Sequence, residues 1–62
     1  IKSIEIIGIE DITSIDVFDI CGRLITASKS NDVDVKHLKD GMYIIRILTK
    51  TKGMISDKLL IQ

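Results

Sequence analysis

Apolar and polar residues alternate with a period of two along much of this chain. Val33 and Val35 alternate with Asp32, Asp34 and Lys36, and Ile15 and Val17 alternate with Ser14, Asp16 and Phe18. This period is typical of β-strands that place one face on a core. β-branched residues, above all isoleucine, are abundant, as strands prefer. The pattern predicts six strands, at Ser3–Ile7, Ser14–Asp19, Arg23–Ser28, Asp32–Val35, Met42–Thr49 and Met54–Ile61.

Signals for turns recur at intervals of roughly 8–12 residues, which favours an all-β sandwich or barrel over a fold with helices. Gly22 in Asp19–Gly22 and Gly53 in Lys50–Gly53 can each supply the left-handed residue of a hairpin. The segment from Lys36 to Asp40 is too short for a helix, and we expect one tight turn there. Leu38 then reaches the core, and Gly41 redirects the backbone.

One predicted strand is more apolar than the others. The run Met42–Leu48 is apolar on both faces except at one arginine. Such a strand is usually central in its sheet and covered on both sides. We expect Ile45 to be the most buried residue of the chain, with Ile47, Val17 and Leu59 close to it.

Size and composition restrict the possible functions. The chain has 62 residues, a single cysteine, and nine basic residues balanced by nine acidic ones. A domain of this size has a small core, and one cysteine allows no internal disulfide. The charge balance and the presence of only two aromatic residues argue against a nucleic-acid surface, and no apolar run is long enough for a membrane span. The chain begins at Ile1 without an initiator methionine, so we expect a piece of a longer polypeptide.

The residues that could carry chemistry have simpler structural explanations. His37 lies three residues from Asp34 and three from Asp40, but on a turn and without a second histidine or a nearby cysteine. Cys21 could be paired with His37 as nucleophile and base, but a hairpin tip does not exclude water from its thiol. We therefore expect no catalytic residue, no metal and no cofactor. We expect Arg46 to pair with a carboxylate or reach the sheet edge, and the Tyr43 hydroxyl to bond to backbone.

The order of the motifs resembles a known family. These motifs are Phe18-Asp19-Ile20-Cys21-Gly22-Arg23, Leu38-Lys39-Asp40-Gly41-Met42-Tyr43, the turn with Gly53, and Lys58-Leu59-Leu60. In this order and spacing, the run from Ser14 to Ile61 is similar to the type A C-terminal sorting domain of the type IX secretion system. The family usually opens with a segment containing Asn-Pro, whereas this chain has no proline, so the resemblance implies that the first segment is missing.

The resemblance implies a fold, a function and partners. It implies a small immunoglobulin-like antiparallel β-sandwich over residues 1–62, placed at the end of a secreted protein as a signal for export to the cell surface or medium. The implied partners are the type IX translocon, its outer-membrane barrel shuttle protein (PorV-type) and a surface sortase-like protease (PorU-type), without direct insertion into the membrane. The implied recognition and structural residues are Asp19, Gly22, Leu38, Gly41, Tyr43, Gly53, Lys58, Leu59 and Leu60. An immunoglobulin-like or fibronectin-like accessory or binding module of an extracellular protein remains the alternative.

Overall fold

The computed structural model describes residues 3–62 and contains six strands and no helix within them. The strands are β1 (Ser3–Glu5), β2 (Ile12–Phe18), β3 (Leu24–Ser28), β4 (Asp32–Asp34), β5 (Gly41–Thr49) and β6 (Met54–Ile61). All six predicted strands are therefore confirmed, and most of the ends that differ do so by one residue. β1 is two residues shorter than predicted, and β2 begins two residues earlier.

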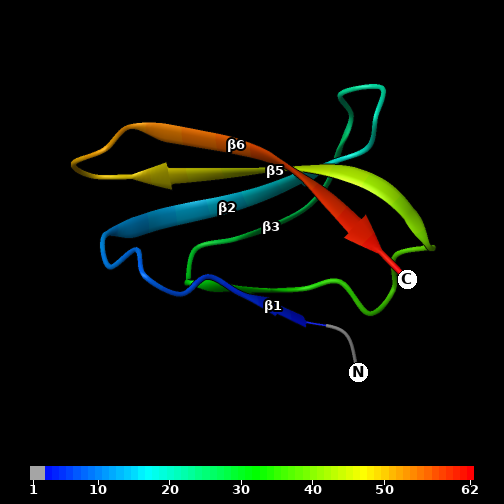
Figure 1. Ribbon diagram of the computed structural model, residues 1–62, viewed down its shortest axis with the longest axis horizontal. Coiled ribbons are helices and arrows are strands. Elements are labelled where there is room, and N and C mark those ends of the chain that lie inside the picture. Colours follow the sequence, from blue (N-terminus) through cyan, green and yellow to red (C-terminus); the bar gives the residue numbers. More distant parts are fainter. Residues whose placement is uncertain (1–2) are drawn as a thin grey trace.

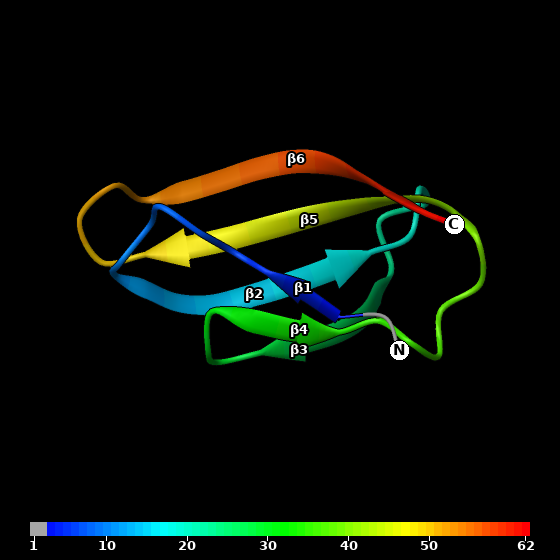
Figure 2. The same ribbon diagram turned by 60° about the horizontal axis from the view of Figure 1, so that its bottom comes forward.

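The strands form two antiparallel sheets that pack together as a small sandwich (Figure 1). The larger sheet has the order β3-β2-β5-β6, and the smaller one pairs β1 with β4. Figure 2 shows the two-stranded sheet lying across one face of the larger sheet. The predicted sandwich is thus confirmed, and β5 is central in its sheet, as the sequence predicted.

The core lies between the two sheets. Ile15 and Val17 of β2 face Ile47 and Ile45 of β5, and all four are buried. From the small sheet and the turn after it, the buried residues are Val33, Val35 and Leu38. The most buried side chains are Ile15 and Val17, both 0% exposed, and not Ile45 as predicted, which is 6% exposed. Ile45 is less covered because its partner on β6 is the exposed Asp57, so only its β2 side carries a buried apolar neighbour, Val17.

The outer face of the larger sheet is not covered by the described residues. Met42, Ile44 and Leu48 of β5 are 45%, 37% and 46% exposed, although the sequence predicted cover on both faces of this strand. That prediction was wrong because the small sheet has only two strands, and both lie on the other face (Figure 2). Charge and cation–π contacts occupy the middle of the exposed face instead. Arg46 pairs with Asp16 at 3.2 Å and lies 4.7 Å from the centre of the Phe18 ring, which confirms the predicted carboxylate pairing.

The connection between the two sheets is fastened to the β5–β6 hairpin. The Asp11 carboxylate accepts hydrogen bonds from the backbone N–H of Thr51, at 2.8 Å, and from the Thr51 hydroxyl. The N–H of Lys50 also donates to the Asp11 carbonyl oxygen at 3.1 Å. The Thr51 hydroxyl is the main reason that the pKa of Asp11 lies below its ordinary value, because the bonds stabilise the ionised carboxylate.

Candidate recognition site

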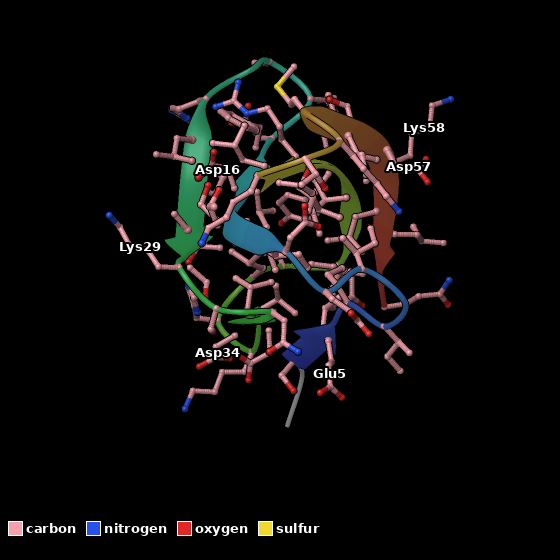
Figure 3. The ribbon with its side chains drawn as sticks, turned by 90° about the vertical axis from the view of Figure 1, so that its left-hand side faces the viewer. Glu5, Asp16, Lys29, Asp34, Asp57 and Lys58 are labelled. Carbon is pink, nitrogen blue, oxygen red and sulfur yellow. The ribbon has the colours of Figure 1, made fainter. Side chains whose placement is uncertain are left out.

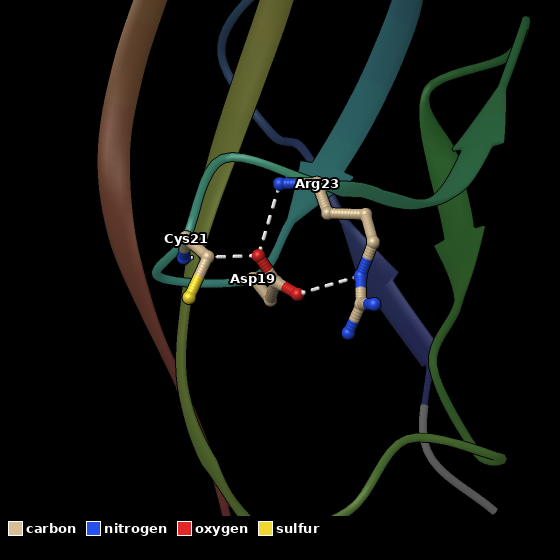
Figure 4. A network of polar contacts seen from close by, with 3 residues as sticks. All are labelled: Asp19, Cys21 and Arg23. Atoms are coloured by element: carbon tan, nitrogen blue, oxygen red, sulfur yellow. Dashed lines mark hydrogen bonds and ion pairs between the residues drawn. The ribbon is translucent and has the colours of Figure 1, made fainter.

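The β2–β3 hairpin is organised by one carboxylate (Figure 4). One oxygen of Asp19 accepts the backbone N–H groups of Cys21 and Arg23, both at 2.9 Å, and the other accepts Nε of Arg23 at 3.1 Å. These donors lower the pKa of Asp19, and the Arg23 backbone amide contributes most. Gly22 has φ +87°, as predicted for the left-handed position of this turn. The hairpin also contains a bulge, since the pairing shifts by one residue between Val17 and Phe18.

The segment between β4 and β5 forms the predicted tight turn. The N–H of Leu38 donates to the Val35 carbonyl oxygen at 3.0 Å, and the Leu38 side chain is buried in the core. Gly41 follows with φ +152°, a value that residues with a Cβ rarely adopt. The Tyr43 hydroxyl then donates to the Lys39 carbonyl oxygen at 2.8 Å. The Leu-x-x-Gly-x-Tyr spacing therefore describes one structural unit in which the tyrosine closes the turn that the leucine anchors.

The last strand places its motif residues on different surfaces. Lys58 lies opposite Ile44 and is exposed, and Leu60 lies opposite Met42 on the outer face, 56% exposed. Leu59 lies opposite Tyr43 and packs against the core. Figure 3 shows Lys58 pointing away from the body of the molecule. Of these three residues, Lys58 and Leu60 can contact a partner, whereas Leu59 helps to hold the strand.

Strand pairing brings most of the motif residues to one end of the larger sheet. The end of β2, the beginning of β5 and the end of β6 meet there, because Phe18 pairs with Ile44 and Ile44 with Lys58. The β2–β3 turn and the turn before β5 lie at this end, near the C-terminus (Figure 1). Gly53 closes the β5–β6 hairpin at the opposite end, with φ +72°. Gly53 is therefore a hairpin residue far from the others.

The residues considered for chemistry lie on the surface. Cys21 is exposed at the hairpin tip, and His37 is exposed on the turn after β4. Among residues 3–62, no three His, Cys, Asp or Glu side chains are grouped so that they could hold a metal ion. The described part of the chain also contains no helix long and apolar enough to cross a membrane.

Comparison with known proteins identifies the family. The family model of the secretion system C-terminal sorting domain matches residues 1–62 of the sequence. The chain belongs to this family. No curated protein and no solved structure matches the chain.

Membership of the family has direct consequences. The family is one of sorting signals for type IX secretion, and such a signal implies export to the cell surface or medium through contact with the type IX machinery. It is not a family of enzymes. The match also includes the residues before Ser14, to which the sequence motifs did not extend.

The sequence motifs missed one residue of the site. Asp57 lies opposite the buried Ile45, at a position where the period of two calls for an apolar side chain, yet it is exposed. Its carboxylate accepts the backbone N–H of Lys58 at 2.7 Å. The signal that could have revealed it was this break in the alternation Ile55, Asp57, Leu59 and Ile61.

Proposed function

We propose that this domain is the C-terminal signal that takes an attached cargo protein from the periplasm through the type IX outer-membrane translocon. The outer-membrane barrel shuttle protein receives it, and the sortase-like surface protease removes it. The domain is not itself an enzyme and acts through recognition of its folded surface. The observation that carries this proposal is the match to the sorting-domain family over all 62 residues.

The geometry supports a role for one end of the larger sheet. The turn at Asp19–Gly22 is fixed by the hydrogen bond from the Arg23 backbone N–H to the Asp19 carboxylate, and the turn at Leu38–Tyr43 by the bond from the Tyr43 hydroxyl. Both turns therefore present a defined shape to a partner. The C-terminal strand runs to this end and carries an exposed Lys58 and a partly exposed Leu60. Rigid turns beside an accessible strand suit recognition by another protein, because little conformational freedom is lost on binding.

The proposal is tested by fusing the domain behind a reporter that reaches the periplasm of a host with type IX machinery. We expect the reporter at the cell surface or in the medium, and a fusion without residues 58–62 to remain inside. A known sorting domain in the same fusion serves as the control. If that control is exported while the intact fusion stays in the periplasm, the domain is an accessory module of an extracellular protein instead.

A further inference from the structure

The outer edge of β6 is an open strand edge. In the larger sheet β6 pairs with β5 along eight residues, and no other described strand pairs with it. Its length of about 27 Å offers a long row of backbone groups. Exposed edges of this kind pair with other strands unless something blocks them.

The register shows which backbone groups are free. The N–H of Thr49 donates to the Gly53 carbonyl oxygen at 2.9 Å, and these two residues are opposite each other at the end of the β5–β6 ladder. Because hydrogen-bonded and non-bonded pairs alternate in an antiparallel ladder, the backbone groups of residues 55, 57, 59 and 61 point towards β5. The backbone groups of residues 54, 56, 58 and 60 therefore point away from β5, in the plane of the sheet and towards the open edge.

The middle of this open edge is occupied by a carboxylate. Asp57 lies at an inner-face position, but its side chain is exposed and accepts the outward N–H of Lys58 at 2.7 Å. Figure 3 shows Asp57 and Lys58 together on the β6 side of the molecule, away from Lys29 on the β3 side. An open hollow of about 530 Å³ lies beside them, lined by Ile44, Ser56, Asp57 and Lys58. A charged residue turned inwards on an edge strand is a common protection against unwanted pairing.

The charges also act against pairing between two copies of this chain. In a two-fold antiparallel pair, opposite residues must lie on the same face of the joint sheet. Two registers meet this condition with the longest overlap of the two β6 strands. One places Asp57 opposite Asp57 of the second copy, and the other places Lys58 opposite Lys58 of the second copy. Like charges directly opposite each other are destabilising, whereas opposite charges stabilise a pair.

We propose that the outer edge of β6 accepts an extended segment of a different protein, in antiparallel pairing, with a basic side chain opposite Asp57. In the free domain the carboxylate covers the Lys58 N–H. The basic side chain of the partner takes over that carboxylate, and the Lys58 N–H then donates to a carbonyl oxygen of the partner strand. On the opposite, outer face of the same edge, the exposed apolar side chains of Met54 and Leu60 extend the contact. This inference adds a binding mode to the proposed function. It rests on the proposed function only in requiring that a partner protein binds the domain.

The test uses the domain itself as the partner strand. In the register that places position 57 opposite its own copy, an Asp57→Lys chain presents a lysine to Asp57 of the unaltered chain. We expect each chain alone to be monomeric in sedimentation at about 100 µM, because like charges then lie opposite each other. We expect the equimolar mixture of the two chains to form a heterodimer, because opposite charges then lie opposite each other. This heterodimer should dissociate in about 1 M salt, which screens the attraction between the charges. The matched control is Glu10→Lys, an exposed position outside the strands with the same change of charge.

Three results would overturn the proposal: a mixture that stays monomeric, dimers of Asp57→Lys alone, or an equal dimer from the Glu10→Lys mixture. A second measurement does not depend on the folding of a variant. A peptide copying residues 54–60 with lysine at position 57 should bind the unaltered domain several-fold more tightly than the peptide of native sequence. Equal binding of the two peptides would also refute the proposal. Neither measurement involves secretion, so a failure here is distinguishable from a failure of the reporter fusion to be exported.

Discussion

The hydroxyl of Tyr43 and the carbonyl oxygen of Lys39 are joined by a hydrogen bond of 2.8 Å across four residues. The arrangement resembles the tyrosine corner of β-sandwiches, in which a tyrosine near the start of a strand bonds to backbone a few residues upstream. The bond fixes the path by which the chain leaves the small sheet, passes the buried Leu38 and enters β5. It thereby sets the shape of the end at which the motif residues gather.

Removal of this hydroxyl should weaken the domain without disturbing its core. Tyr43→Phe keeps the half-buried ring and loses one hydrogen bond, so we expect the free energy of unfolding to fall by about 1 kcal/mol. Tyr43→Ala also removes the ring from its contact with the core, and we expect a larger loss. Urea unfolding followed by circular dichroism measures both. An equal midpoint for Tyr43→Phe and the unaltered domain would show that the bond contributes nothing.

The positive φ at Gly22 predicts a specific order of substitutions. No atom outside the neighbouring residues lies within 4 Å of the Cβ that Gly22→Ala would add, so the cost is backbone strain. We expect a loss of about 1–2 kcal/mol for alanine and a smaller one for Gly22→Asn, since asparagine tolerates the left-handed region better. Gly41→Ala, at φ +152°, should also destabilise the fold. The prediction fails if the denaturation midpoints of both alanine variants match that of the unaltered domain.

Stability should decrease in acid because two carboxylates hold hydrogen-bonded loops. The pKa values of Asp11 and Asp19 are lowered from the ordinary value of 3.8, so both groups bind protons more weakly when folded than when unfolded. Their contribution is therefore complete above about pH 4 and is lost as the pH falls through the lower, folded values.

Asp19→Asn should flatten this acid dependence, because the titrating group of the β2–β3 hairpin is gone. The measurement is the denaturation midpoint between pH 2 and pH 6. Glu10→Gln is the matched control, since Glu10 is exposed and lies outside the strands. An Asp19→Asn curve as steep as that of the control would contradict the assignment.

Two substitutions in β6 separate folding from recognition. Lys58 is exposed and Leu59 packs against the core, although they are neighbours in sequence. Lys58→Ala should leave the free energy of unfolding within about 0.5 kcal/mol and reduce export of a reporter fusion, whereas Leu59→Asp should abolish both folding and export. Circular dichroism of the isolated domain and cell-surface reporter signal measure the two effects. Normal export of Lys58→Ala would show that its side chain is not recognised.

The sequence by itself determined the strands and the turns. A period of two and abundant β-branched residues are local properties, and they located all six strands. The turns were equally readable, because Gly22 and Gly53 occupy positions that need positive φ, and Leu38 is the only apolar side chain between Lys36 and Asp40. The sequence also indicated that Arg46 could pair with a carboxylate, since a charge in an apolar strand needs a counter-charge, but it did not identify Asp16 as that partner.

Only the tertiary structure decided which faces and edges are open. The apolar face of β5 at Met42, Ile44 and Leu48 reads as buried, yet it is exposed because the second sheet has two strands and covers one side. The role of Asp57 likewise depends on strand order. β6 lies at the edge of its sheet, and there the Asp57 carboxylate accepts the backbone N–H of Lys58, which no neighbouring strand uses. Burial and edge position depend on how separate strands are stacked and ordered, and a periodic pattern within one strand contains no information about either.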